Sequence, residues 1–338
     1  MQLGVFGASG QVGNVMRQIL AERDFPADQV RFFASSRTAG TTLPWKDETI
    51  VVEDTATADF TGLDLAVFSA GATMSRQYAE KVVAAGATVV DNSSAWRLDP
   101  GVPLVCSEVN PEDVVNPPKG IISNPNCQTM AILPAVKALH DVAGLTRLIV
   151  TTFQAVSGSG LAGVQTLNDQ VNALANPTTL AYDGRYDDCG DQGPYVAPIA
   201  FNVIPIAGKL VDDGTGETDE EVKVRLEARK ILHLPELPIQ ATCVRVPVFS
   251  GHSVAVNLEF ATPITPDQAL AVLAQAPGVA LRDVPTPRWA TGKDPSYVGR
   301  IRADQSAQPG HGLTMFVSND NLRKGAALNA IQILELIV

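Results

Sequence analysis

A glycine-rich turn near residue 10 constrains the fold more than any other feature of this sequence. The turn reads Gly7-Ala-Ser-Gly10-Gln-Val-Gly13, with the spacing G-x-x-G-x-x-G rather than G-x-G-x-x-G. It follows an apolar strand expected over residues 2–6 and opens a helix expected over 12–22. Glycines in such a turn let the backbone approach a pyrophosphate, which the helix N-terminus then holds. The turn therefore predicts a dinucleotide-binding domain with candidate contacts at Gly7, Ser9, Gly10, Gln11 and Val12.

The strand that follows this helix indicates which dinucleotide is bound. NAD sites place an Asp or Glu near the end of the second strand, where it holds the ribose hydroxyls. Here a strand expected over residues 30–34 leads into Ser35-Ser36-Arg37, with no acid. Two hydroxyls and a guanidinium suit a 2′-phosphate through charge-assisted hydrogen bonds. We therefore predict NADP as the cofactor.

Short apolar runs alternate with helix-like stretches in the first third of the chain. This pattern predicts a parallel sheet covered on both faces, a doubly wound α/β (Rossmann-type) domain over residues 1–126, completed by a helix within 318–338. Residues 127–317 have longer strands and fewer crossovers, which favours an α+β domain with a mostly antiparallel sheet. The elements expected there are a helix over 127–140 kinked at Pro134, a charged helix over 217–232, a long excursion over 172–198, and strands over 148–154, 200–205, 242–249 and 253–260.

One of the four cysteines has the context of a nucleophile. Cys127 follows Ser123-Asn-Pro-Asn126, a run that suits the start of a helix, so its thiol would lie in the first turn. The positive end of the helix dipole there stabilises a thiolate. Among the histidines, His252 is the candidate proton shuttle because it lies at a bend between two expected strands. The other three cysteines are expected to be buried small side chains.

Composition excludes several functional classes. The formal net charge of −11 disfavours nucleic acid as a partner, so an anionic substrate needs local positive charge. No apolar run is long enough to span a bilayer, and no leader-like segment is recognised, which favours the cytoplasm. The absence of a C-x-x-C pair argues against a metal site. The apolar run over 195–204 predicts an exposed face of the second domain's sheet that forms a homodimer contact.

Seven segments spread along the chain resemble the aspartate-semialdehyde dehydrogenase family. They are the glycine turn, Asp91-Asn-Ser-Ser-Ala-Trp-Arg97, Ser123-Asn-Pro-Asn-Cys127, Gln154-Ala-Val-Ser-Gly-Ser-Gly160, Glu220-Glu-Val-Lys223, Arg245-Val-Pro-Val-Phe-Ser-Gly-His252 and Asp320-Asn-Leu-Arg-Lys-Gly-Ala327. The resemblance implies reversible, NADP-dependent conversion of L-aspartate 4-semialdehyde and phosphate to 4-aspartyl phosphate through a thioester. It also implies a homodimer and a place in lysine, threonine, methionine and diaminopimelate synthesis.

The same resemblance implies a role for each matching residue. Cys127 would be the nucleophile, His252 the acid/base, and Gln154 the group that positions the reacting carbonyl. Arg245 and Glu220 would hold the amino-acid end of the substrate. The remaining implied contacts are Arg97, Asn126 and Lys223 for phosphate, and Ser157, Gly158 and Asn321 for the nicotinamide end of the cofactor.

Three alternatives remain open from the sequence. N-acetyl-γ-glutamyl-phosphate reductase shares the chemistry and architecture, and a glyceraldehyde-phosphate-type dehydrogenase is more distant. Neither of their substrates has a free α-amine, so both should lack an acid placed like Glu220. A catalytically dead NADPH-binding sensor is the third alternative, and the Cys127–His252 pair argues against it.

Overall fold

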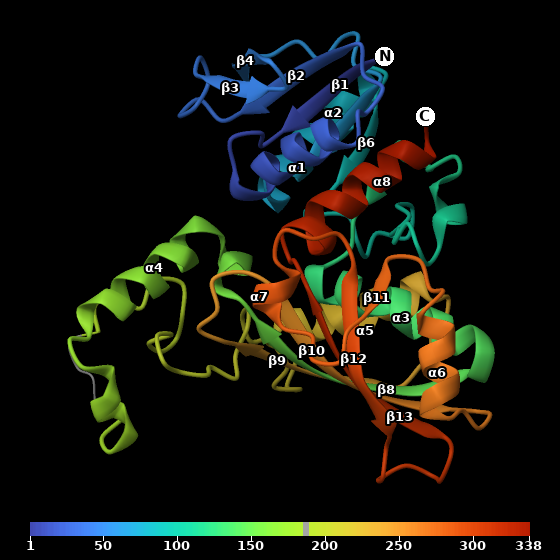
Figure 1. The fold of residues 1–338 in the computed structure, drawn as a ribbon. Coiled ribbons are helices and arrows are strands. Elements are labelled where there is room, and N and C mark those ends of the chain that lie inside the picture. Colours follow the sequence, from blue (N-terminus) through green and yellow to red (C-terminus); the bar gives the residue numbers. More distant parts are fainter. Residues whose placement is uncertain (185–188) are drawn as a thin grey trace. The chain divides into compact units, whose positions relative to one another are not determined.

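A computed structural model describes residues 1–184 and 189–338 (Figure 1). The chain divides into two compact units. Unit 1 comprises Met1–Pro134, Leu226–Pro235 and Leu322–Val338, and unit 2 comprises Ala135–Arg225 and Glu236–Asn321. The division falls inside two helices, α3 (Cys127–Ala143) and α5 (Asp219–Ile231). The domains predicted from the sequence differ from these units in three segments, since residues 127–134 and 226–235 belong to unit 1 and residues 318–321 belong to unit 2.

Unit 1 is built on a seven-stranded sheet in the order β3-β4-β2-β1-β5-β6-β7. All neighbours are parallel except the edge strand β3, which pairs antiparallel with β4. The predicted doubly wound fold is thereby confirmed. The strands are β1 (Gln2–Phe6), β2 (Gln29–Ala34), β3 (Thr42–Trp45), β4 (Glu48–Asp54), β5 (Leu65–Phe68), β6 (Thr88–Asp91) and β7 (Ile121–Ser123).

Helices cover both faces of this sheet because its strands are apolar on both sides. Along β1, Leu3 and Val5 join a core cluster with helices α1 (Gln11–Glu22) and α8 (Leu328–Leu336). Phe6 joins a second cluster with helix α2 (Ala72–Ala84). Alternate residues of a strand point to opposite faces, so the two clusters lie on the two sides of the sheet. A π-helical turn, η4 (Arg323–Ala327), precedes α8.

Unit 2 contains a six-stranded sheet in the order β11-β12-β13-β10-β8-β9. Three of the five pairings in this part of the described chain are antiparallel, and β11–β12 and β8–β9 are parallel. The register places Gln154 beside Arg245 and His252 beside Asn319. The strands are β8 (Leu145–Gln154), β9 (Ile239–Arg245), β10 (His252–Phe260), β11 (Val279–Leu281), β12 (Ser296–Ala303) and β13 (Gly312–Asn319).

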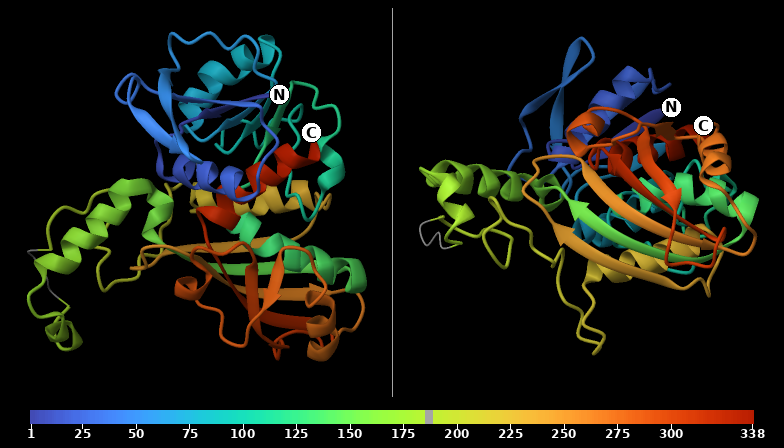
Figure 2. Two further views of the ribbon diagram at one scale, coloured as in Figure 1. Left: turned by 45° about the horizontal axis from the view of Figure 1, so that its top comes forward. Right: turned by 60° about the horizontal axis from the view of Figure 1, so that its bottom comes forward.

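A long excursion leaves the sheet of unit 2 between β8 and β9. It begins with the 3-10 turn η2 (Val156–Ser159) and helix α4 (Gly160–Ala173), which project away from the strands in both views of Figure 2. Helices α6 (Pro266–Leu273) and α7 (Pro287–Ala290) lie later in the unit. Among the described residues, no helix combines the length and apolarity needed to cross a membrane.

The strand predicted over residues 200–205 is wrong. This segment forms turns and makes only an isolated bridge between Ile204 and Arg245. Phe201 has a left-handed φ of 57°, which interrupts an extended conformation. The amide Oε1 of Gln170 accepts the N–H groups of Ile199 and Ala200, which in a sheet would bond to a neighbouring strand. The apolar run is instead explained by packing of Ile199, Ala200 and Ile204 against α4.

Candidate active site

The glycine turn is packed too tightly for side chains at two positions. A Cβ on Gly7, whose φ is +78°, would lie 2.5 Å from the carbonyl oxygen of Ser69, and one on Gly13 would overlap the carbonyl oxygen of Gly7. Gly10 is the N-cap of α1, and no described side chain caps this helix. Its first N–H groups therefore have no side-chain acceptor, as a site for an anion requires. The Oε1 of Gln11 is also buried without a partner in the described chain.

The turn after β2 lies against the glycine turn. Ser35, Ser36 and Arg37 are exposed, and the Oγ1 of the next residue, Thr38, is 3.2 Å from the Oγ of Ser9. The two segments predicted to bind the dinucleotide are therefore neighbours in unit 1.

Cys127 is the first residue of helix α3. The Oδ1 of Asn126 accepts the backbone N–H of Gln128 at 2.9 Å, which makes Asn126 the helix cap, and it lies 3.9 Å from the Cys127 Sγ. Cys127 is only partly buried, whereas the other three cysteines are buried. Burial raises the pKa of the Cys106 thiol far above its ordinary value, so Cys106 stays protonated. Position and exposure thus make Cys127 the candidate nucleophile among the four cysteines.

A glycine packs against this cysteine. Gly325, in the π-helical turn η4, comes so close that a Cβ added there would lie 2.9 Å from the Cys127 Cβ. The preceding residue, Lys324, is fully buried and forms an ion pair with Glu108. The sequence motif containing both residues contributed only Asn321 to the predicted site, and their contacts emerge only in the structure.

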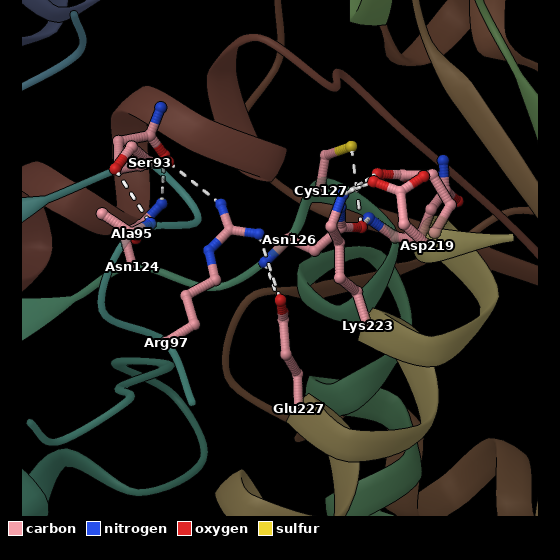
Figure 3. Close-up of polar contacts among 12 residues, drawn as sticks. Ser93, Ala95, Arg97, Asn124, Asn126, Cys127, Asp219, Lys223 and Glu227 are labelled. Atoms are coloured by element: carbon pink, nitrogen blue, oxygen red, sulfur yellow. Dashed lines mark hydrogen bonds and ion pairs between the residues drawn. The ribbon is translucent and has the colours of Figure 1, made fainter. Parts of the chain in front are cut away.

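Arg97 is buried in unit 1 with its guanidinium partly engaged (Figure 3). Its Nη1 donates to the Glu227 Oε1 at 3.1 Å, and its Nη2 donates to the carbonyl oxygen of Asn92 at 2.9 Å. The Nε is buried without a partner in the described chain. A guanidinium has five N–H donors, so most of them remain available for an anion.

Two residues in the second half of α5 hold the Arg97 segment, and sequence reasoning missed both. Glu227, with no exposed surface, also accepts the backbone N–H of Asn126 at 2.6 Å. Lys230 donates to the carbonyl oxygens of Arg97, Asp99 and Val102 at 2.8–3.0 Å. A signal existed in the sequence, because Glu227 falls on the apolar stripe of the helix formed by Val224, Ala228 and Ile231.

His252 opens strand β10 and is fully buried. Its Nδ1 accepts the backbone N–H of Ala155 at 2.9 Å, so the neutral ring carries its proton on Nε2. The Nε2 atom has no partner in the described part of the chain. Burial, and then the charge of Arg245, hold the pKa of His252 well below its ordinary value. The imidazole is therefore neutral at pH 7 and presents an N–H donor.

Arg245 and Gly158 complete the surroundings of this ring in unit 2. Arg245 ends strand β9, and its Nη1 donates to the carbonyl oxygen of Ala155 at 2.8 Å. A Cβ on Gly158 would lie 3.0 Å from this Nη1 and 3.2–3.3 Å from the His252 Cε1 and Nε2. The absence of a side chain at residue 158 thus leaves room for both groups.

Gln154, Glu220 and Lys223 form a hydrogen-bonded chain in unit 2. The Nε2 of Gln154 donates to Glu220 at 3.2 Å, and the Lys223 Nζ donates to Glu220 at 2.9 Å. The same Nζ donates to Asp219 at 2.7 Å (Figure 3). Burial lowers the pKa of Lys223, but the charges of Glu220 and Asp219 outweigh this and raise it above the ordinary value. Lys223 is therefore a permanent cation beside the carboxylate of Glu220.

Ser157 and Asn321, the two remaining predicted residues, are hydrogen-bonded to each other. The Asn321 Nδ2 donates to the Ser157 Oγ at 2.9 Å, and its Oδ1 accepts the N–H of Gly251 at 2.9 Å. The structure therefore brings the predicted residues of unit 1 into two groups, the glycine turn with the turn after β2, and Arg97 with Asn126 and Cys127. It brings those of unit 2 into hydrogen-bonded groups at the ends of strands β8, β9 and β10.

Comparison with known proteins defines the class of enzyme. Residues 2–116 match the model "Semialdehyde dehydrogenase, NAD binding domain", and residues 136–324 match "Semialdehyde dehydrogenase, dimerisation domain". These two matches cover most of the chain and define it as a semialdehyde dehydrogenase.

Relatives and solved structures narrow the class. The aspartate-semialdehyde dehydrogenases of Streptomyces akiyoshiensis and Corynebacterium glutamicum are 59% and 58% identical, with at least 98% of each chain covered. The crystal structure of aspartate semialdehyde dehydrogenase II from Vibrio cholerae matches with a TM-score of 0.91 and 40% identity, covering 99% of this chain and 98% of that one. The chain belongs to the aspartate-semialdehyde dehydrogenase family, whose members are NADP-dependent phosphorylating oxidoreductases.

The family assignment confirms the resemblance drawn from the sequence. The N-acetyl-γ-glutamyl-phosphate reductase alternative is not favoured, because the full-length relatives described above are aspartate-semialdehyde dehydrogenases. The fold of unit 2 agrees with a family that carries a dimerisation domain in this part of the chain.

Proposed function

We propose that this chain interconverts L-aspartate 4-semialdehyde and 4-aspartyl phosphate through a thioester on Cys127. A solved relative from Vibrio cholerae, 39% identical, is titled as a complex with ASA, which we take as the semialdehyde. The observation that carries the proposal is the position of Cys127 at the first residue of a capped helix. The helix dipole stabilises its thiolate, the form that attacks a carbonyl.

The proposed chemistry has two stages in the oxidative direction. The Cys127 thiolate adds to the aldehyde carbon, and the aldehyde oxygen takes up a proton to give a thiohemiacetal. The thiohemiacetal then loses a hydride from that carbon and gives up the proton from its oxygen, leaving a thioester. Phosphate then attacks the thioester carbon, the C–S bond breaks, and Cys127 returns as thiolate. NADP, when bound, accepts the hydride. In the biosynthetic direction the same steps run in reverse.

His252 is proposed to serve the oxygen of the reacting carbonyl. Its neutral ring presents Nε2–H, a donor that stabilises negative charge developing on that oxygen, and the ring moves the proton in its acid/base role. Gln154 is proposed to orient the same carbonyl, since its side chain is fixed by Glu220 and by Thr152.

The charged groups of the substrates need separate anchors against a net charge of −11. Arg245 is proposed for the α-carboxylate, since a planar guanidinium binds a carboxylate through two N–H groups, and Glu220 for the α-ammonium. For phosphate we propose Arg97, Lys223 and Asn126. The buried, unpartnered Nε of Arg97 supports this assignment.

The cofactor residues are proposed from the contacts in each unit. Gly7, Gly10 and the start of α1 would hold the pyrophosphate, because the turn has no room for a side chain at Gly7 or Gly13 and the N-cap, Gly10, supplies no side-chain cap to the helix N–H groups. The turn after β2 would hold the 2′-phosphate through Arg37. The other proposed contacts are Ser9, Gln11, Val12, Ser35 and Ser36 in unit 1 and Ser157, Gly158 and Asn321 in unit 2.

The assembly is proposed to be a homodimer of two-domain subunits, with residues 1–126 and 318–338 as the nucleotide domain and 127–317 as the catalytic and dimerisation domain. Val196, Phe201 and Val203 are 65%, 48% and 59% exposed, so the segment they occupy is a candidate contact even though it is not a strand. The cytoplasm is the proposed compartment, since four scattered cysteines in a chain of this length do not form the pattern of a disulfide framework, and neither nucleic acid nor membrane is proposed as a partner.

A steady-state assay tests the proposed function. NADP reduction is measured with aspartate semialdehyde and with N-acetylglutamate semialdehyde, each with and without phosphate. We expect phosphate-dependent turnover with aspartate semialdehyde and no turnover with N-acetylglutamate semialdehyde. Turnover that prefers the acetylated aldehyde, or that does not depend on phosphate, would contradict the proposal.

Sedimentation of the wild type and of Val203→Asp at micromolar concentration tests the dimer, which the aspartate should weaken.

A further inference from the structure

We propose that Glu227 is a positioning residue. Its single buried carboxylate fixes the phosphate-binding Arg97 relative to the start of α3, the helix that carries the nucleophile. The inference rests on the proposed function, because it takes Arg97 as the phosphate anchor. Glu227 itself is not proposed to touch either substrate.

The two oxygens of this carboxylate have separate tasks. Oε1 accepts from the Arg97 Nη1 at 3.1 Å, and Oε2 accepts the backbone N–H of Asn126 at 2.6 Å. Asn126 is the residue that caps α3 immediately before Cys127. One rigid group, with a side chain only 1% exposed, therefore joins the proposed phosphate anchor to the start of the nucleophile's helix.

Neutralising charge alone does not require this geometry. A buried carboxylate needs a cation, and Arg97 supplies it, but the bond to Asn126 uses a neutral N–H group in another segment. The Asn126 N–H precedes the helix, where backbone donors have no acceptor within the helix, and Glu227 accepts this N–H group. The same carboxylate thus fixes the positions of two segments. Attack of phosphate on a Cys127 thioester requires these two segments to be correctly placed relative to each other.

Lys230 supports the same arrangement from one turn further along α5. Its ammonium binds three backbone carbonyl oxygens of the Arg97 segment, at residues 97, 99 and 102. The backbone of the segment is therefore fixed by Lys230, and the guanidinium is fixed by Glu227. Loss of Glu227 should leave the segment folded but let the Arg97 side chain turn away.

Two substitutions separate positioning from charge balance. Glu227→Gln keeps the volume but has one acceptor oxygen, so it loses either the Arg97 or the Asn126 bond. Glu227→Asp keeps the charge but withdraws the carboxylate by one methylene. If the residue only balances charge, Glu227→Asp should match the wild type. If it positions Arg97, both variants should bind phosphate more weakly.

Glu221 provides a matched control on the same helix. It is a buried carboxylate that accepts the backbone N–H groups of Thr218 and Cys243 at 2.6 and 2.9 Å. Glu221→Gln therefore removes a buried carboxylate of similar environment without touching Arg97 or Asn126. We expect its KM for phosphate to stay within about twofold of the wild-type value.

The experiment measures KM for phosphate, KM for the aldehyde and kcat in the oxidative direction, with Arg97→Gln in parallel. We expect Glu227→Gln and Glu227→Asp to raise the phosphate KM about tenfold and to lower kcat, with the aldehyde KM within twofold, because about 1.4 kcal/mol of lost binding is tenfold. An unchanged phosphate KM in either soluble Glu227 variant, or equal rises in both KM values, overturns the inference. If Arg97→Gln itself leaves the phosphate KM unchanged, the proposed phosphate anchor fails instead.

Discussion

The substitution Gly158→Ala tests whether the surroundings of His252 and Arg245 in unit 2 limit catalysis. The added methyl carbon would lie 3.0 Å from the Arg245 Nη1 and 3.2 Å from the His252 Cε1. Both groups are already held by Ala155, the ring through its N–H and the guanidinium through its carbonyl oxygen. The added methyl group therefore forces one of them to move, and that movement strains its hydrogen bond to Ala155.

The size of the effect follows from these distances. Carbon reaches its optimal non-bonded separation at about 3.5 Å, so Arg245 or His252 has to shift by roughly 0.5 Å. A misplacement of about 1 Å costs about a hundredfold in rate, and half of that should cost about tenfold. We expect kcat/KM for the aldehyde to fall about tenfold, which corresponds to about 1.4 kcal/mol of transition-state stabilisation.

The assay is phosphate-dependent NADP reduction at saturating NADP, so that a weakened cofactor contact does not mask the result. Gly184→Ala is the matched control, since a Cβ there meets nothing within 4 Å on an exposed loop of the same unit. The control should keep wild-type kinetics. If Gly158→Ala also keeps kcat/KM within twofold, the positions of Arg245 and His252 do not limit the reaction and their assigned roles are wrong.

Three further outcomes are expected. Cys127→Ala should abolish turnover while equilibrium titration still shows NADP binding; a tenth of wild-type turnover would exclude Cys127 as the nucleophile. Arg37→Ala should weaken NADP binding by about 1.5–3 kcal/mol in the same titration, and equal wild-type affinity for NAD and NADP would contradict the 2′-phosphate assignment. The lowered pKa of His252 means that the unfolded state takes up a proton first as the pH falls below about 6.5, so wild-type stability should drop with a slope of up to about 1.4 kcal/mol per pH unit. Urea unfolding between pH 7.5 and 5 should show a shallower slope for His252→Gln, and identical slopes would contradict the buried neutral ring.

The first unit could be predicted closely because its signals are local. The strand predicted over residues 2–6 matches β1 in full, and the strand predicted over 30–34 lies within β2, since short apolar runs bounded by polar residues and glycine define them. In unit 2 the sequence indicates β8 and β10 but not β11, β12 or β13. Strand β12 contains Gly299 and two exposed charged residues, Arg300 and Arg302, so its apolar periodicity is weak.

The site shows the same limit in another form. Sequence patterns predicted Cys127 at a helix start because the cap precedes it directly in the chain. They could not predict that Gln154 is bound to Glu220, or that Glu227 joins Arg97 to Asn126, because these partners are 66 to 130 residues apart. Hydrogen bonds between polar groups far apart in the chain produce no periodic pattern in the sequence. The one signal is a charged residue, Glu227, on the apolar stripe of its helix.

Helix α8 determines when the first unit can be completed during synthesis. Leu328, Ile331 and Leu334 belong to the core cluster that also contains Leu3 and Val5 of β1, and the Asn329 Nδ2 donates to the carbonyl oxygen of Val105 at 2.9 Å. The part of this face that α8 covers therefore stays exposed on the ribosome until residue 334 has emerged, whereas the segments of unit 2 end at Asn321. Domains usually fold in the order in which they are made. Here the part of the protein that is translated first is the last to acquire its full core, and a nascent chain stalled before residue 328 would present to chaperones the apolar surface that α8 covers over β5 and β6.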